Sequence, residues 1–168
     1  MQHQVRLLDQ KVGPENTPGN SLTKDGPQVI EFNCRFGDPE AQVILPRLRT
    51  DLVSAMLATT NASLHHFDMR WDPRAAVTVV MASKGYPGSY EKGSVIHAID
   101  AAETVPDCNV FHAGTALADN GDLIAVGGRV LAVTALGDDA ETARRNAYAG
   151  VAKIDWQGGF YRSDIAKT

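Results

Sequence analysis

The sequence has little cysteine, no long apolar run and no excess of positive charge. Its two cysteines, Cys34 and Cys108, have neither metal-ligand spacing nor the density of a disulfide scaffold, so we expect two reduced thiols. No apolar run approaches the ~20 residues that a membrane-spanning helix needs. The net charge of -4 gives no general attraction to nucleic acid or to anionic membranes, and neither partner is expected.

Residues 1–10 are where a secretory leader would show an apolar region. They mix glutamine, histidine, arginine and aspartate, so we expect no signal peptide and a cytoplasmic protein. Hydrophobic residues make up 43% and charged residues 21%, an ordinary composition for a globular protein. A length of 168 residues fits one large domain or two small ones, and no repeat or low-complexity tract divides it.

The first 27 residues differ from the rest of the chain. Residues 13–20 are dense in turn formers, and Asp25-Gly26-Pro27 adds another turn signal. We expect a loosely structured lead-in with one short strand at its start, and we assign residues 1–20 to a linker.

Residues 29–36 alternate in polarity from Ile30 onward. Apolar side chains lie on one side (Ile30, Phe32, Cys34, Phe36) and polar side chains on the other (Glu31, Asn33, Arg35). This period of two predicts a strand with one packed face and one open face.

A helix is expected after the break at Gly37-Asp38-Pro39. Asp38 is placed to cap it, with Pro39 at its first position and Glu40 in its first turn. Apolar residues at helical spacing continue to Met56. Pro46 lies inside this segment and predicts either a kink or two helical pieces.

From Trp71 onward the pattern changes to short strands. The candidates are residues 75–81, 95–99, 109–113, 123–126 and 129–133. Gly127-Gly128 predicts a two-residue hairpin between the last two candidates. A further short strand is expected within residues 158–164.

One long helix is expected in this second half. Asp138 and Asp139 are placed to cap it, and apolar residues at helical spacing carry it from Ala140 to Ile154. We place a domain boundary near residues 68–74.

Glu31, Asn33 and Arg35 are the first candidates for chemistry. Side chains two apart on a strand project from the same face, so a carboxylate, an amide oxygen and a guanidinium would line up. Hard oxygen donors suit magnesium together with phosphate oxygens, and arginine suits phosphate. The alternation alone fits a magnesium-nucleotide rim or a solvated polar face on an edge strand, and by itself it favours the solvated face.

The wider sequence resembles the glycinamide ribonucleotide synthetases, which are phosphoribosylamine–glycine ligases of the ATP-grasp superfamily. Residues 29–42 (VIEFNCRFGDPEAQ) resemble the metal-binding strand and following helix of that family. Later blocks resemble its carboxy-terminal domain in order: residues 83–93, 110–115, 127–134 and 160–165. The resemblance covers about residues 21–166.

The resemblance implies roles for four residues. Glu31 and Asn33 would bind the Mg²⁺ (or Mn²⁺) ions that bridge the ATP phosphates. Arg35 would face the phosphates or the acyl phosphate, and Asp38 would lie at the substrate end of the cleft. Arg35 and Asp38 are therefore the candidate catalytic residues, and Glu31, Asn33 and Arg35 the candidate nucleotide-binding residues. The implied reaction belongs to purine biosynthesis and joins glycine to 5-phosphoribosylamine with ATP as co-substrate.

Each of the other candidate polar residues allows two interpretations. The loop Lys84–Tyr90 fits a lid over the sugar phosphate or a tight connection between strands, and the tight connection is favoured. His97 and His112 lack partners at metal spacing, so packed or surface histidines are favoured. Arg129 and Arg162 fit substrate contacts or surface ion pairs equally well.

The resemblance implies an α+β fold in which residues 21–70 end an ATP-grasp domain. Residues 71–168 would form a small β-barrel-like (barrel-sandwich) domain with one long helix. The nucleotide-covering elements of an ATP-grasp cleft are not recognisable ahead of Glu31, so we expect a truncated piece of the ligase that is inactive alone. The alternative is a non-catalytic interaction module that self-associates or pairs with a chain supplying the missing half.

Overall fold

The computed structural model describes residues 20–23, 26–29 and 35–167 of the chain. The chain divides into two compact units, residues 1–37 and residues 38–168. In the first unit, strands β1 (Asn20–Thr23) and β2 (Gly26–Val29) form an antiparallel pair. Arg35 and Phe36 are not part of a strand. The expected strand over residues 29–36 otherwise falls on residues outside the described ones.

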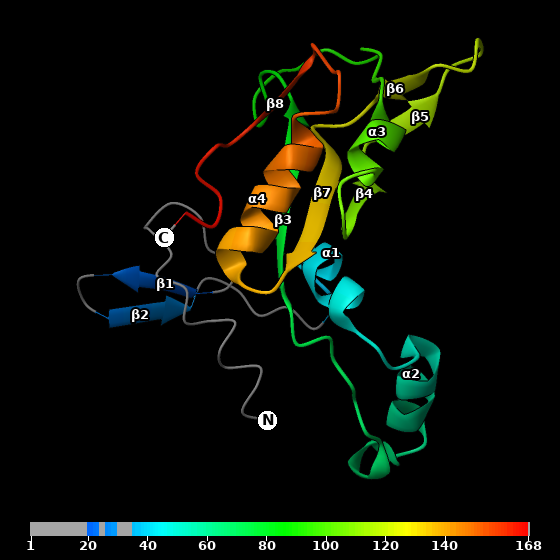
Figure 1. The fold of residues 1–168 in the computed structure, drawn as a ribbon, viewed down its shortest axis with the longest axis vertical. Helices are drawn as coiled ribbons and strands as arrows, with labels where there is room; N and C mark the ends of the chain where they lie inside the picture. Colours follow the sequence, from blue (N-terminus) through cyan, green and yellow to red (C-terminus); the bar gives the residue numbers. More distant parts are fainter. Residues whose placement is uncertain (1–19, 24–25, 30–34, 168) are drawn as a thin grey trace. The chain divides into compact units, whose positions relative to one another are not determined.

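The second unit is built on a four-stranded antiparallel sheet with the strand order β4-β7-β3-β8 (Figure 1). The strands are β3 (Ala75–Ser83), β4 (Cys108–His112), β7 (Arg129–Gly137) and β8 (Gly159–Tyr161). Strand β7 is buried from its second residue to its last, because it lies in the middle of the sheet and is rich in valine and alanine. These strands confirm the sequence predictions within a few residues.

Helix α4 (Ala140–Val151) packs against β3 and β7 (Figure 1). The Asp139 side chain accepts a hydrogen bond from the Thr142 N–H at 2.7 Å, which caps the helix as expected and lowers the pKa of Asp139. Small buried residues at spacings of three and four face the sheet (Ala143, Ala147, Gly150, Val151). Their size lets the helix lie close to the sheet.

Cys108 on β4 is a free, buried thiol, and burial raises its pKa. This confirms the expected reduced state for Cys108, whereas Cys34 lies outside the described residues.

The predicted Gly127-Gly128 hairpin is wrong. Strand β6 (Leu123–Ala125) pairs with β5 (Thr115–Leu117) in a separate two-stranded sheet and not with β7. A Cβ atom on Gly114 would lie 2.7 Å from the Cα of Gly127, so these glycines allow two backbone segments to cross rather than forming a two-residue turn.

The expected strand at residues 95–99 is also wrong. Val95 and His97 make isolated bridges only, to Ile124 and Asp155, and Ile99 begins helix α3 (Ile99–Glu103).

The segment after Gly37 is broken into short helical pieces, one of the two outcomes that Pro46 predicts. They are α1 (Ala41–Ile44), the 3₁₀ turn η2 (Leu45–Arg47), α2 (Leu52–Thr60) and the 3₁₀ turn η3 (Leu64–His66). Leu48 is extended and ends the first pair of pieces.

Asp38 does not cap the first of these helices. Glu40 stands at that position and makes no side-chain cap bond. The Asp38 carboxylate instead bonds to Gln42 and Arg129, so the cap prediction is wrong because charged and amide partners compete for it.

The α+β class is confirmed, whereas the barrel-like description is not. The described strands form open sheets with no closed barrel, and β4 and β8 are the edges of the four-stranded sheet. The outer edge of β4 is met by α3, from which the Glu103 carboxylate accepts the Val110 N–H at 3.3 Å. None of the described helices is long and apolar enough to span a membrane. The domain limits at residues 20 and 70 stay predictions.

Replacing Gly137 with alanine should destabilise the second unit. The new Cβ would lie 2.4 Å from the Ala143 nitrogen and 2.8 Å from the Thr142 carbonyl carbon. These are backbone atoms of α4 and cannot rotate away, so we expect the free energy of unfolding to fall by about 1–3 kcal/mol in urea denaturation. Gly88→Ala is the control, because its nearest contact is a single loop carbonyl oxygen at 3.1 Å. Equal stability of the two variants would contradict the close helix–sheet contact.

Candidate functional site

Of the four residues with expected roles, the structure describes Arg35 and Asp38. Glu31 and Asn33 lie outside the described residues. Arg35 is exposed, and its Nη1 donates to the Phe36 carbonyl oxygen at 3.0 Å. Arg35 belongs to the first unit and Asp38 to the second.

Asp38 is joined to the central sheet through Arg129. The Arg129 Nη2 lies 3.0 Å from the Asp38 Oδ2, and the Arg129 Nη1 donates to the Asp38 carbonyl oxygen at 3.2 Å. The Gln42 amide donates to the Asp38 Oδ1 at 3.2 Å. Because Arg129 is the first residue of β7, the sheet holds the backbone and the carboxylate of Asp38 in place. Of the two interpretations that the sequence allowed for Arg129, a substrate contact or a surface ion pair, the structure shows the ion pair.

Arg162 also makes an ion pair. Its guanidinium donates to both carboxylate oxygens of Asp164, at 2.9 and 2.6 Å, and lowers the pKa of Asp164.

The loop Lys84–Tyr90 packs on the crossing at Gly127 and Gly128. The Ser83 hydroxyl donates to the Gly127 carbonyl oxygen at 2.8 Å, and a Cβ on Gly128 would lie 2.3 Å from the Tyr86 ring. These contacts favour the tight connection between strands over a mobile lid.

The two candidate histidines are exposed. The His112 Nδ1 lies 3.0 Å from the Thr115 hydroxyl, and His97 lies in a short backbone bridge. Within residues 20–23, 26–29 and 35–167, no cluster of three His, Cys, Asp or Glu side chains could hold a metal ion.

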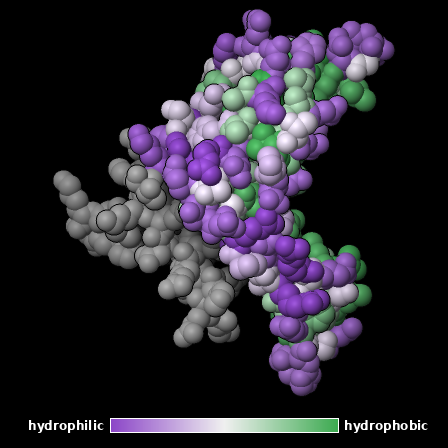
Figure 2. Space-filling model, in the orientation of Figure 1, coloured by the Kyte–Doolittle hydropathy of each residue, from purple (hydrophilic) through white to green (hydrophobic). Residues whose placement is uncertain are grey.

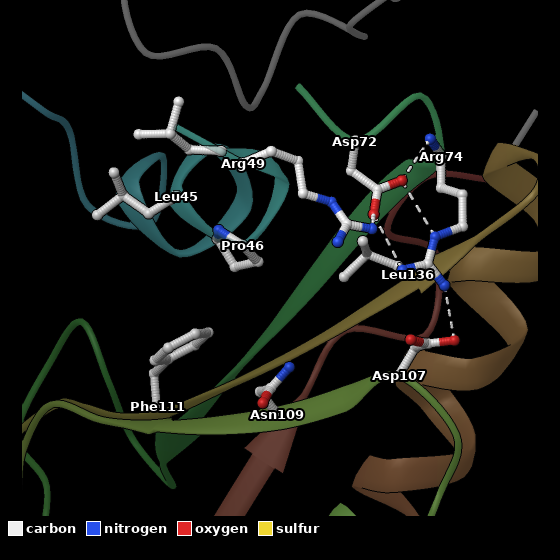
Figure 3. Close-up of a pocket in the computed structure, with 10 residues that line it drawn as sticks. Leu45, Pro46, Arg49, Asp72, Arg74, Asp107, Asn109, Phe111 and Leu136 are labelled. Atoms are coloured by element: carbon white, nitrogen blue, oxygen red, sulfur yellow. Dashed lines mark hydrogen bonds and ion pairs between the residues drawn. The ribbon is translucent and has the colours of Figure 1, made fainter. Parts of the chain in front are cut away.

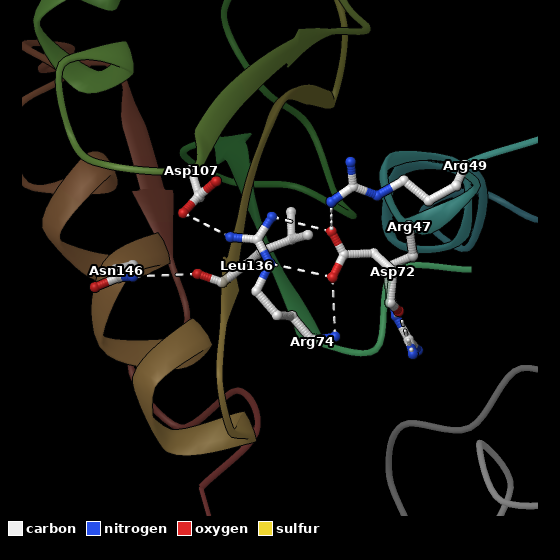
Figure 4. Close-up of polar contacts among 7 residues, drawn as sticks. All are labelled: Arg47, Arg49, Asp72, Arg74, Asp107, Leu136 and Asn146. Carbon is white, nitrogen blue, oxygen red and sulfur yellow. Dashed lines mark hydrogen bonds and ion pairs between the residues drawn. The ribbon is translucent and has the colours of Figure 1, made fainter. Parts of the chain in front are cut away.

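The sequence reasoning missed a buried carboxylate. Asp72 is 2% exposed and accepts hydrogen bonds from the Arg74 side chain at 3.1 and 3.0 Å and from Arg49 (Figure 4). Its carbonyl oxygen accepts two bonds from Arg47, at 3.3 and 3.2 Å. Arg74 reaches on to Asp107 at 2.8 Å. These bonds, those from Arg74 above all, hold the pKa of Asp72 well below its usual range.

This network lies beside an open cavity of about 540 Å³ between the η2 segment and the sheet (Figure 3). Apolar side chains line one part of it, and Arg49, Asp72, Arg74, Asp107 and Asn109 line the other. The two arginines and the two aspartates cancel in charge, and Arg74 is engaged by both carboxylates. The network therefore joins residues 47–49 to the start of β3, and its chemistry is structural.

The second half of the chain matches a family model described as phosphoribosylglycinamide synthetase, C domain, over residues 76–168. The chain belongs to this family. It is 54% identical to the chloroplastic phosphoribosylamine–glycine ligase of Arabidopsis thaliana over 140 residues, which are 83% of this chain and 26% of the relative. It is 50% identical to the ligase of Pseudomonas syringae over 148 residues, which are 88% of this chain and 34% of the relative.

A solved relative has the same fold. The crystal structure of the phosphoribosylamine–glycine ligase of Thermotoga maritima superposes with a TM-score of 0.64 at 34% identity, over 88% of this chain and 35% of that one. The chain thus spans about a third of the length of these bacterial relatives.

The substitution Asp72→Asn should lower the melting temperature of the protein and make that temperature depend less on pH in the acidic range. Because the folded pKa of Asp72 lies below the unfolded one, its contribution is present above the usual carboxyl pKa, about 4, and is lost as pH falls below that value. At neutral pH we expect the melting temperature of the variant to fall by at least ~5 °C. Below about pH 4 the difference between the two melting temperatures should begin to shrink, and it should disappear only when the pH falls below the lowered folded pKa of Asp72.

Asp164→Asn is the matched control for this experiment. Asp164 also pairs with an arginine two residues away, but it is exposed, so its loss should change the melting temperature little. A melting temperature that falls equally in both variants would contradict the special role of the buried carboxylate.

Proposed function

We propose that this chain forms the carboxy-terminal part of a phosphoribosylamine–glycine ligase of purine biosynthesis. The observation that carries the proposal is an identity of about half to curated ligases across 88% of the chain. The proposed reaction converts ATP, glycine and 5-phosphoribosylamine to ADP, phosphate and glycinamide ribonucleotide. The chain acts together with the part of the enzyme that it does not itself span, and alone it is inactive.

The proposed reaction must first activate the carboxylate of glycine, which is a poor electrophile. The carboxylate of glycine cannot be attacked by an amine until an oxygen becomes a leaving group. Transfer of the γ-phosphoryl group of ATP to that oxygen gives glycyl phosphate and ADP. The amine of phosphoribosylamine then attacks the acyl carbon, and the C–O bond to phosphate breaks as the amide forms.

Four residues of this chain are assigned to that reaction. Glu31 and Asn33 supply a carboxylate and an amide oxygen, a donor set that fits Mg²⁺ or Mn²⁺. The ion, when bound, would neutralise charge on the ATP phosphates. Arg35 faces the phosphates or the acyl phosphate, and its exposed guanidinium can form a planar fork with phosphate oxygens.

Asp38 is assigned to the substrate end of the cleft. The paired bonds from Arg129 and the bond from Gln42 support this role, because they hold a half-exposed carboxylate in one orientation. We assign Arg129 as the positioning residue of Asp38.

A second candidate function is an interaction module that pairs with another chain. Large apolar side chains stay exposed on α2 and favour it, since such a surface is usually covered in a working protein. The cytoplasmic location stays a prediction, and one relative is named chloroplastic.

The reaction can be tested with two polypeptides. Alone, the chain should show no tight binding of magnesium-ATP in calorimetry and no release of ADP with glycine and phosphoribosylamine. Co-expressed with the part of the Pseudomonas syringae enzyme that it does not span, it should support turnover. Glu31→Ala should then lower turnover about 100-fold or more, because a ligand of the phosphate-bridging ion is lost.

Glu141→Ala is the control for the loss of a carboxylate, since Glu141 is exposed on α4. Turnover by the chain alone would contradict the need for a second part. Turnover of the pair at an unchanged rate with Glu31→Ala would contradict the assigned metal site.

A further inference from the structure

A β-bulge in β7 sets the direction of the Arg129 side chain. Met81 of β3 is paired with Leu131 of β7. The next residue of β3, Ala82, is paired with Arg129, so Val130 is an extra residue in β7. Without this bulge Arg129 would project from the same face as Leu131, because side chains two apart on a strand point to the same side. The bulge therefore turns Arg129 to the other face of the sheet.

The two faces of the sheet are covered by different parts of the second unit. Helix α4 covers the face that carries Leu131 and Val133, which belong to the apolar core. Residues 45–48 lie over the other face and line the cavity there (Figure 3). Asp38 precedes these residues in the chain and is bonded to Arg129. The bulge is thus what brings the guanidinium to this carboxylate. Figure 2 shows the purple, hydrophilic side chains that gather over the second unit on the face in view.

Phe160 of β8 lies in the same row of side chains as Arg129. Ala82 is paired with Arg129 on one side and with Phe160 on the other, and paired residues of antiparallel strands project from the same face. The two outer positions lie about 10 Å apart, or two strand spacings, and the residue between them carries just a methyl group. Tyr161 alternates to the opposite face, where its ring lies 6.1 Å from the Tyr148 ring of α4.

Three groups of different chemistry therefore lie on the face away from α4, at one end of the sheet. They are the carboxylate of Asp38, the guanidinium of Arg129 and the ring of Phe160. The Asp38 and Arg129 side chains are 51% and 42% exposed, and Phe160 is 38% exposed. Each group is thus held by the fold and still accessible to a small ligand.

The proposed substrate whose chemistry suits this row is 5-phosphoribosylamine. The C–H groups of its sugar ring can pack against an aromatic side chain. Its amine can donate to a carboxylate, and its phosphate can pair with a guanidinium. Glycine has a single methylene group and offers little apolar surface to a ring. The row therefore fits the sugar substrate better than it fits the amino acid.

We propose that Phe160 contacts the sugar ring of 5-phosphoribosylamine and that Asp38 accepts a hydrogen bond from the amine of the same molecule. The inference rests on the proposed function, because the sugar substrate is taken from it. It adds a specificity-determining contact from the last strand of the chain. It also gives a function to the bulge at Val130, which places Arg129 and Phe160 on one face.

The test uses the chain co-expressed with the part of the Pseudomonas syringae enzyme that it does not span. Ribose 5-phosphate, which has a hydroxyl group where the substrate has its amine, is the probe for calorimetry. Phe160→Ala should weaken its binding about tenfold, because the contact with the ring is lost. The KM for phosphoribosylamine should rise by a similar factor, whereas the KM values for glycine and ATP should not change. Phe160→Tyr keeps the ring and should bind ribose 5-phosphate like the parent.

Tyr161→Ala is the matched control for Phe160→Ala. Tyr161 is the next residue of β8, is 42% exposed and points to the α4 face. Its loss should leave the binding of ribose 5-phosphate and all KM values unchanged. Melting temperatures equal to that of the parent would show that the variants fold. If Phe160→Ala no longer co-purifies with the second polypeptide, the ring contacts protein rather than sugar, and the inference is overturned.

The outcomes separate this inference from the proposed function. Binding of ribose 5-phosphate without turnover, weakened in Phe160→Ala and kept in Tyr161→Ala, supports the sugar contact and contradicts the ligase reaction. Turnover in which Phe160→Ala leaves the KM for phosphoribosylamine unchanged overturns the sugar contact and leaves the reaction standing. An equal loss in both variants also overturns the sugar contact, because the effect then belongs to β8 as a whole. A parent pair that neither binds ribose 5-phosphate nor turns over overturns both.

Discussion

The buried carboxylate of Asp72 is the contact on which the arrangement of the second unit depends most. A carboxylate that is 2% exposed is costly unless it is paired, and the charge-bearing bonds from Arg74 and Arg49 supply that pairing. Because Arg47 also donates to the Asp72 backbone, the turn after η2 is tied to the start of β3 from two sides. Removal of the carboxylate would leave two guanidinium groups, those of Arg49 and Arg74, with fewer partners at the start of β3.

A second tie joins the same segment to the other end of the sheet. Arg129 begins β7 and holds Asp38, whereas Asp72 lies just before β3, which runs antiparallel to β7. Each exposed ion pair contributes little stability by itself, so the Arg129–Asp38 pair is more important for orientation than for folding. The segment from Asp38 to Arg49 is therefore positioned by charge, and the sheet beneath it by apolar packing against α4.

The periodicity of the sequence predicted those helices and strands that show a regular pattern of apolar residues or a local capping residue. Strands β3, β4 and β7 and helix α4 follow from alternation, β-branched runs and the Asp139 cap. The Gly127-Gly128 hairpin failed because Gly127 packs against Gly114, thirteen residues earlier, and Gly128 packs against the Tyr86 ring, and no local rule contains such contacts. Asp72 was missed for the same reason: its partner Arg49 lies 23 residues earlier, and only folding brings them together. Of the expected site, Arg35 and Asp38 can be located, and the family resemblance rather than the strand pattern singled them out.

The two kinds of contact explain why α2 stands apart from the rest of the unit. The ion pairs of Asp72 and Arg129 hold the segment that ends at Arg49. The chain is next joined to this segment at Trp71, which forms an antiparallel bridge with Leu48. Residues 52–67 lie between these fixed points and bring no charge of their own. Only apolar burial can fix such a segment, and α2 buries just Ala55 and Ala58 against its own neighbours. The larger apolar side chains of this helix (Val53, Met56, Leu57) therefore stay exposed, because neither the charged contacts nor the packing of the described part of the second unit reaches them.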